Sequence, residues 1–345
     1  MALNRATRRT ISITVIALLL LGGGGLIFKD AVRGVIDVVT GAEYSGNGTG
    51  SVLVTIHSGD TGEDVANTLV SAGVTKSFGP TYREILRQNA EFYPGQYQLQ
   101  TQMSSASAVS LLLGGGSRVE TKVLIKEGWR SSQIFKALSK TYGVPLKDFE
   151  SIKPSDLGLP SAAINLDGYL FPATYTFVPG QSAKSMLKAM HQRMLEELSS
   201  LGISESKAHR VLTLAALVQR EGRSSADFAK MARVFLNRID IGMHLQSDAT
   251  VSYGVGSNTV STTAAQRADD NPWNTYLHAG LPAGPISAPG RAAIEAALKP
   301  AEGNWLYFCT VNLETGETEF NETYAGHERS VAKWRAWMAA NPGWE

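Results

Sequence analysis

Apolar residues in the middle of the chain recur at positions i, i+3, i+4 and i+7, which is the spacing of one face of an α-helix. These residues are Val211, Leu214, Ala215 and Val218. Glu221 lies about one turn past the last of them and continues the apolar face, whereas Arg220 points about 100° away from it. Because Gly222 follows, the pattern predicts a helix over residues 205–221 that ends in an acid on its apolar side.

Patterns of the same kind predict the remaining elements of the C-terminal half. Helical spacing indicates helices over 183–198, 226–239 and about 327–339. Runs of β-branched and aromatic residues predict two strands over 305–311 and 317–321. The aromatic segment 166–177 alternates in part, which is typical of a buried strand.

The N-terminal half contains an internal repeat. Residues 54–74 and 123–144 each consist of a β-branched run, a glycine and an amphipathic helix that ends in Gly-Val. Between the copies, the sequence predicts a hairpin and a short helix with Ser104 or Ser105 as its N-cap. The turn-rich segment 153–160 then marks a domain boundary.

The N-terminal segment predicts a membrane anchor. Residues 11–28 carry no charged side chain, and at a rise of ~1.5 Å per residue they span about 27 Å, enough to cross a bilayer. Arginines at positions 5, 8 and 9 place the N-terminus in the cytoplasm. A cleaved signal peptide is the alternative, but the run is long for one and no clear A-x-A cleavage site follows. We therefore expect a single-pass protein of the cytoplasmic (inner) membrane with its C-terminal part outside.

The expected organisation is that of an α+β chain. It comprises a cytoplasmic tail at 1–10, a transmembrane helix at 11–28, a Gly/Ser/Asn-rich linker at 29–50, a repeat-containing module at 51–152 and a mixed α/β domain at 153–345.

Composition and the absence of several motifs exclude some classes of partner and of catalytic site. The 345 residues carry a net charge of +1, so no basic field indicates a nucleic-acid partner. Cys309 is the single cysteine and cannot form an intrachain disulfide. The six histidines are scattered, and the sequence lacks an H-E-x-x-H, a G-x-S-x-G or a P-loop motif. We therefore expect neither a metal nor another cofactor.

A carboxyl group at the end of an apolar face is partly removed from water, which favours its protonated form. Glu221 is therefore a candidate for a general acid. Periodicity alone leaves a second interpretation open, in which Glu221 turns to solvent and Gly222 is the C′ residue that ends the helix.

Two further segments group polar side chains. The segment GMHLQSDATVSYG at 242–254 offers Gln246, Ser247 and Asp248, although it also fits a turn that leads into a short helix. The segment 274–290 is rich in proline and glycine and contains Asn274 and Tyr276. It fits either a semi-rigid binding loop or a structural connector.

Four segments together resemble the endolytic murein transglycosylase family, also called YceG-like. They are, in chain order, LDGYLFPATY, ALVQRE, VFLNRIDIGMHLQSDATVSYG and NTYLHAGLPAGPIS, and the resemblance extends from the membrane segment to about residue 335. It implies a membrane anchor, a LysM-like module at 51–152 and a catalytic domain at 153–345. The reaction it implies is cleavage of the β-1,4 bond between MurNAc and GlcNAc within glycan strands, with a 1,6-anhydro-MurNAc end on the product and no cofactor.

The resemblance also implies roles for individual residues. The family's catalytic glutamate lies in a motif similar to ASIVEKE, which reads AALVQRE here, so Gln219 replaces its first acid and Glu221 carries the proton. Sugar binding is the implied role of Asn237, Gln246, Ser247, Asp248, Asn274 and Tyr276. Alanines at positions 173, 249, 283 and 288 depart from the family's usual residues and affect the shape of the sugar site. The aromatic rings of 166–177 are also suited to stacking on sugars.

Two other functions stay open at this point. A hydrolase would use Glu221 with Asp248 as its second carboxylate and would leave a reducing end in place of an anhydro end. A catalytically inactive wall anchor would bind glycan through the repeat-containing module. The resemblance favours the transglycosylase, with peptidoglycan glycan strands as substrate and with the peptidoglycan synthases and the cytoplasmic membrane as its partners.

Overall fold

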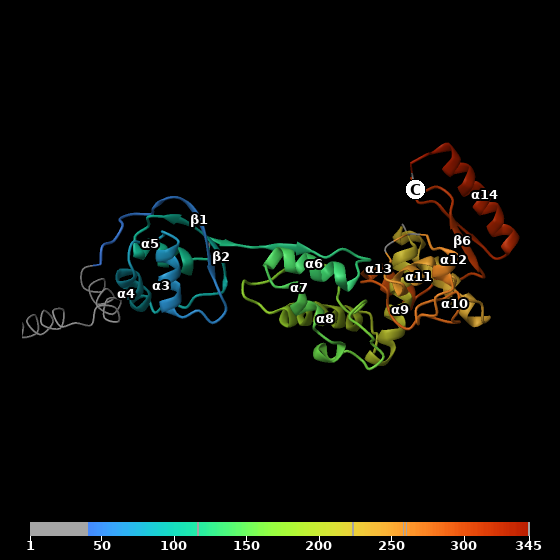
Figure 1. Ribbon diagram of the computed structural model, residues 1–345, viewed down its shortest axis with the longest axis horizontal. Coiled ribbons are helices and arrows are strands. Elements are labelled where there is room, and N and C mark those ends of the chain that lie inside the picture. Colours follow the sequence, from blue (N-terminus) through green and yellow to red (C-terminus); the bar gives the residue numbers. More distant parts are fainter. Residues whose placement is uncertain (1–40, 116, 223, 258, 260, 344–345) are drawn as a thin grey trace, which may run out of the picture. The chain divides into compact units, whose positions relative to one another are not determined.

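The computed structural model describes residues 41–115, 117–222, 224–257, 259 and 261–343, which belong to two compact units, Met1–Glu120 and Thr121–Glu345 (Figure 1). The predicted tail, the predicted transmembrane helix at 11–28 and the first part of the linker lie outside the described residues. Within the part of the chain that is described, every helix is too short or too polar to cross a bilayer.

In the first unit, helices pack against a small antiparallel sheet. Its elements are β1 (Thr49–Ile56), α3 (Gly62–Ser71), α4 (Phe78–Arg87), β2 (Gly95–Thr101), α5 (Ser105–Leu113) and β3 (Arg118–Val119). The strand order is β1–β2–β3, and β1 pairs with β2 along nearly its whole length. Val54 and Ile56 alternate into the core of this unit, where they meet Val65 and Leu69 of α3.

The two copies of the repeat bury the predicted residues but do not share one core. In each copy the helix buries the expected pair, Val65 and Leu69 in α3 and Ile134 and Leu138 in α6 (Ser131–Tyr142). The first pair belongs to the core of the first unit and the second pair to the core of the second, because α6 packs against α7 (Leu146–Glu150). The chain therefore divides between Glu120 and Thr121, and the boundary expected at 152/153 falls inside the second core.

The second unit is mainly helical. Its helices are α6, α7, α8 (Ala183–Ser200), α9 (Glu205–Glu221), α10 (Phe228–Asp240), α11 (Asp248–Gly254), α12 (Ala264–Arg267), α13 (Arg291–Leu298) and α14 (Tyr324–Ala340), with 3-10 turns at Pro154–Leu157 and Ser225–Asp227. Its strands pair antiparallel, β4 (Lys122–Leu124) with β5 (Thr174–Thr176) and β6 (Tyr307–Thr310) with β7 (Thr318–Asn321). Helices beside small separate sheets make the fold α+β, as predicted.

Most elements predicted for this unit are confirmed to within a few residues. Helices α8, α9 and α10 and strands β6 and β7 lie where the sequence predicts them. Helix α14 begins earlier than predicted because the side chain of Thr323 accepts a hydrogen bond from the N–H of Gly326 and caps the helix there. The segment 166–177 supplies buried aromatic rings, but it is a strand only at Thr174–Thr176.

Helix α9 lies at the centre of the second unit. All residues from Leu212 to Val218 are buried, so the helix is enclosed on every side and not only along the predicted stripe. It packs against α10, α11 and α13. Ala215 and Ala216 of α9 and Ala293 of α13 are fully buried in the same core.

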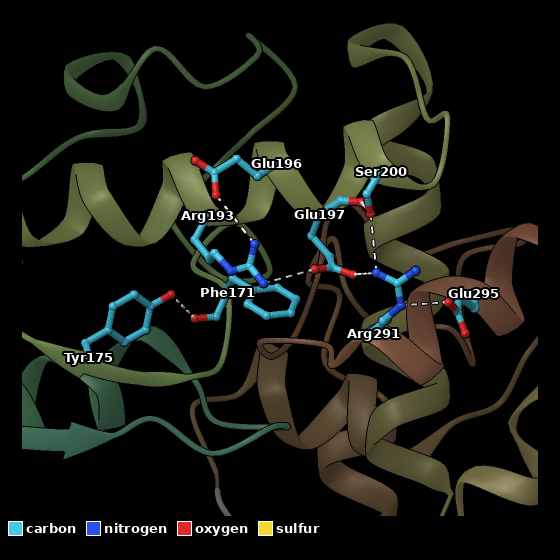
Figure 2. A network of polar contacts seen from close by, with 8 residues as sticks. All are labelled: Phe171, Tyr175, Arg193, Glu196, Glu197, Ser200, Arg291 and Glu295. Atoms are coloured by element: carbon cyan, nitrogen blue, oxygen red, sulfur yellow. Dashed lines mark hydrogen bonds and ion pairs between the residues drawn. The ribbon is translucent and has the colours of Figure 1, made fainter.

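A buried carboxylate joins α8 to α13 (Figure 2). Glu197 of α8 is only 3% exposed and forms ion pairs with Arg291, the first residue of α13, and with Arg193 at 3.6 Å. Arg291 also pairs with Glu295 at 2.8 Å, and the guanidinium of Arg193 lies 5.5 Å from the ring centroid of Phe171. Loss of either arginine would leave the buried carboxylate short of a partner, so the cluster fixes the two helices relative to each other.

Candidate active site

The carboxyl group of Glu221 lies at the C-terminal end of α9 and faces Ser247. The hydroxyl of Ser247 donates a hydrogen bond to Oε1 of Glu221. Ser247 is itself buried, and its N–H donates to Oγ1 of Thr275 at 3.1 Å. Oγ1 of Thr250 in α11 lies 2.8 Å from the same Thr275 atom. The end of α9, the start of α11 and the loop at 274–276 therefore meet at Glu221.

This environment changes the acidity of Glu221. Burial raises the pKa of its carboxyl group above the ordinary value, and the negative charge of Asp248 raises it further. The hydrogen bond from Ser247 and the positive charges of Arg220 and Arg238 lower it, but the net shift is upward. The carboxyl group therefore keeps its proton to a higher pH than an exposed glutamate does, which is what a general acid requires.

The glycine after Glu221 is needed for space. Gly222 has φ −86° and ψ 132°, so it does not adopt the left-handed conformation of the C′ residue considered above. A Cβ at this position would lie 2.4 Å from a ring carbon of Phe228, the first residue of α10. The alternative in which Glu221 turns to solvent does not hold either, because its side chain is hydrogen-bonded to Ser247.

Asp248 is a fixed carboxylate next to Ser247. Its Oδ1 accepts hydrogen bonds from the hydroxyl of Thr262 at 2.5 Å and from the phenol of Tyr276 at 2.9 Å. Burial, together with the hydrogen bond to Asp248, raises the pKa of Tyr276 to about 12, so the phenol remains a donor at neutral pH. The structure thus brings Ser247, Asp248 and Tyr276 together with Glu221, as the sequence predicts.

Gln246 is presented by a strained turn. Its side chain is exposed and its φ is 50°, in the left-handed region that costs a non-glycine residue about 1–3 kcal/mol. The N–H of Gln246 donates to the carbonyl of Thr275 at 3.1 Å, which holds the turn against the 274–276 loop. The amide of Gln246 is therefore accessible to a ligand beside Ser247.

Asn274 and Asn237, which were expected to bind sugar, bond instead to the main chain. Nδ2 of Asn274 donates to the carbonyls of Arg267 and Asp269 at 3.0 and 2.6 Å, and its Oδ1 accepts the N–H of Tyr276 at 3.0 Å. Nδ2 of Asn237 donates to the carbonyls of Gly303 and Trp305 at 3.0 and 2.9 Å. This geometry favours positioning roles, in which Asn274 orients Tyr276 and Asn237 ties α10 to the segment before β6.

Arg238 also belongs to the site, although no periodic pattern in the sequence marks it as a site residue. Its Nε donates to the carbonyl of Leu306 at 2.6 Å and its Nη1 to that of Leu245 at 2.7 Å. Its guanidinium also lies 5.2 Å from the ring centroid of Tyr307. The positive charge lowers the pKa of Glu221, so Arg238 stabilises the carboxylate form that follows proton transfer. The one sequence feature that could have pointed to Arg238 is its place within the motif NRIDIGMH.

Among the residues that the structure describes, no group of three or more His, Cys, Asp or Glu side chains is placed to hold a metal ion. The groups that meet at the site are a carboxyl group with a raised pKa, a second carboxylate held by two hydroxyls, and an exposed amide. This set can donate and recover one proton and can stabilise positive charge nearby.

Comparison with known proteins identifies the family. The sequence profile of the YceG-like family matches residues 54–333. The chain belongs to the YceG-like family. A Bacillus subtilis protein named endolytic murein transglycosylase is 30% identical over 307 residues, which cover 82% of this chain and 85% of the relative. A Streptococcus pneumoniae protein of the same name is 28% identical over 82% of this chain, but over only 58% of its own length.

A solved structure is also similar. The crystal structure of a yceG-like protein from Listeria monocytogenes matches with a TM-score of 0.55 and 28% identity, covering 81% of this chain and 99% of that one. In this YceG-like chain, Oε1 of Gln219 accepts the N–H of Gly290 at 2.9 Å, just before α13. Gln219 is thus occupied in joining two helices, and Glu221 is the acid in the last turn of α9.

Replacement of Glu221 by glutamine should raise Tm at pH 8 and change it little at pH 4. Because the folded-state pKa is raised, the stability from this group is complete below the unfolded pKa of about 4.3 and is lost as pH rises through the folded pKa. Glutamine keeps an acceptor for Ser247 and removes the charge. We expect a rise of about 2–4 °C at pH 8, which corresponds to ~1 kcal/mol in a unit of this size.

Thermal unfolding of the wild type and the variant at both pH values tests this expectation. Glu205→Gln is the matched control, because Glu205 is the exposed first residue of the same helix. A Tm difference for Glu221→Gln that is equal at pH 4 and pH 8, or that is negative at pH 8, would show that the carboxyl group is not disfavoured in its charged form.

Proposed function

We propose that this YceG-like chain is a membrane-anchored endolytic murein transglycosylase, which cleaves the β-1,4 bond between MurNAc and GlcNAc within peptidoglycan glycan strands. The observation that carries the proposal is the Glu221 carboxyl group, which ends the buried helix α9, accepts a hydrogen bond from Ser247 and has a raised pKa. The names of the B. subtilis and S. pneumoniae relatives support the same reaction class.

In the proposed mechanism, Glu221 acts first as an acid and then as a base. It donates its proton to the glycosidic oxygen as the bond from that oxygen to C1 of MurNAc breaks, and positive charge develops at C1. The carboxylate then accepts the proton of the 6-hydroxyl of the same MurNAc, whose oxygen bonds to C1. The product carries a 1,6-anhydro end, Glu221 regains its proton, and no water is consumed.

Asp248 supports the charge that develops in this reaction. Its carboxylate is held by Thr262 and Tyr276, so it needs little reorganisation when positive charge appears at C1. A second carboxylate near the acid is also the arrangement that a hydrolase uses. The two reactions differ in their products, because hydrolysis leaves a reducing end and the proposed reaction leaves an anhydro end.

Glu221→Gln should abolish nearly all activity. General acid–base catalysis contributes about 10²–10⁴-fold in rate, which corresponds to about 3–5 kcal/mol of barrier. Because one group serves both proton transfers, the loss should lie at or above the upper end of this range. Asp248→Asn should cost less, since Asp248 moves no proton. The measurement is the release of anhydro-muropeptides from purified peptidoglycan, quantified by mass spectrometry.

Glu205→Gln, on the same helix, controls for changes in charge, and Tm controls for folding. If folded Glu221→Gln keeps more than about a tenth of wild-type activity, Glu221 is not the general acid. If the wild type releases reducing ends only, the reaction is a hydrolysis that uses Asp248 as the second carboxylate.

We further propose that the first unit is a LysM-like module that positions glycan. The arrangement β1–α3–α4–β2, with β1 and β2 paired antiparallel, supports this interpretation. Deletion of residues 51–120 should then reduce cleavage of polymeric peptidoglycan by about tenfold, or ~1.4 kcal/mol, and leave short oligomers as substrates. Rates of anhydro-product release from the two substrates measure the effect. Equal losses on both would mean that the unit is only a spacer.

The proposed anchor at 11–28 predicts a single span with the N-terminus in the cytoplasm. The uncharged run and the arginines before it motivate this topology. A reporter that is active only outside the cytoplasm should be active when fused after Glu345, and one that is active only inside should be silent there. The reverse pattern would exclude the proposed orientation.

A further inference from the structure

The loop before α6 lies against the end of α9 that carries Glu221. A Cβ on Gly128 in this loop would lie 3.7 Å from Cγ of Gln219. Gln219 is followed directly by Arg220 and Glu221. Arg130, two residues after Gly128, is therefore brought to the same end of α9 as these two side chains.

The side chain of Arg130 rests on an aromatic ring whose orientation is fixed. Its guanidinium carbon lies 5.0 Å from the ring centroid of Tyr253, which belongs to α11. The phenol of Tyr253 donates to Oδ2 of Asp167 at 2.7 Å. Asp167 also accepts the N–H and the hydroxyl of Ser131, at 2.6 and 3.0 Å. Both oxygens of Asp167 are thus engaged by other donors, and the ring cannot turn freely away from the guanidinium.

Arg130 and Arg220 are two positive charges without an ion-pair partner among the described residues, where no carboxylate lies within 4.0 Å of either guanidinium. Arg130 is half-buried and Arg220 is exposed. Burial lowers the pKa of Arg130 and the charge of Arg220 lowers it further, whereas the charges of Asp167 and Tyr253 raise it. The net shift of the Arg130 pKa is downward, so Asp167 does not fully offset burial and the second guanidinium, and a bound anion would stabilise both positive charges.

We propose that Arg130 and Arg220 form an anion subsite beside Glu221, which binds a carboxylate carried on the lactyl arm of MurNAc. This inference rests on the proposed function, because the proposed substrate supplies that arm. The planar guanidinium binds a carboxylate through paired hydrogen bonds, and a bound anion also relieves the repulsion between the two arginines. The sugar rings are neutral, so the carboxylate is the lactyl group's own in peptide-free strands and belongs to the peptide in substituted ones.

Three glycan substrates of equal length separate these sources. The first carries peptides, the second is peptide-free with a free lactyl carboxylate, and the third is peptide-free with that carboxylate converted to a neutral methylamide. The enzymes are the full-length wild type and the variants Arg130→Gln, Arg220→Gln and Arg210→Gln. Arg210 is the matched control, because it is an exposed arginine on the same helix as Arg220 and lies far from its end. The readouts are kcat/KM, KM and Tm.

We expect Arg130→Gln and Arg220→Gln each to lower kcat/KM about tenfold, or ~1.4 kcal/mol, on a carboxylate-bearing substrate, mainly through KM. Both variants should act on the methylamide substrate like the wild type, and Arg210→Gln should be unchanged throughout. A loss confined to the peptide-bearing substrate assigns the anion to the peptide, and a loss on the free lactyl form assigns it to the sugar. Equal losses on charged and neutral substrates, or no loss on any, would overturn the subsite.

Binding separates this inference from the proposed reaction. In the Glu221→Gln background, which binds substrate without turnover, the dissociation constants of the charged and neutral substrates are measured with and without Arg220→Gln. A preference for the charged substrate that disappears with Arg220 supports the subsite even if the wild type forms no anhydro product, in which case only the proposed reaction fails. The absence of any such preference refutes the subsite, whatever the wild type produces.

Discussion

The position of the Glu221 carboxyl group is fixed by the helix that carries it. Residues Leu212–Val218 are buried on every side, so the last turn of α9 cannot shift without disturbing the core of the second unit. The buried helix therefore fixes the position of the carboxyl group that carries the proton. Ser247 meets the carboxyl group with one hydroxyl, while the charges of Asp248 and Arg238 act on its pKa in opposite directions.

The parts around this carboxyl group support one another through the main chain. The 274–276 loop is shaped by the buried amide of Asn274, and the same loop receives the N–H groups of Gln246 and Ser247. Arg238 joins α10 to the carbonyls of Leu245 and Leu306, on two different segments. The loops around Glu221 are thus held by hydrogen bonds to backbone atoms, in addition to the buried helix α9 that carries the acid.

Periodicity predicted the helices of the second unit, because their apolar faces are long enough to be read in sequence, and it placed Glu221 on the buried side of one of them. Residue type alone could not show that the phenol of Tyr276 bonds to Asp248, whereas the side-chain amide of Asn274 bonds to the main chain. The same limit hid Arg238, since nothing in a sequence tells which carbonyls an arginine will reach. Similar apolar stripes in α3 and α6 could not reveal that the two helices enter different cores.

The ring of Phe228 packs so closely against Gly222 that the turn after α9 has no room for a side chain at this position. A Cβ at position 222 would lie 2.4 Å from a ring carbon of Phe228. Phe228 is the first residue of α10, the helix that also carries Arg238. A substitution at 222 would therefore displace the acid and its neighbouring cation together. The side chains of Gln246 and Arg220 are exposed, so a substitution at either position would change contacts with a ligand without moving these helices.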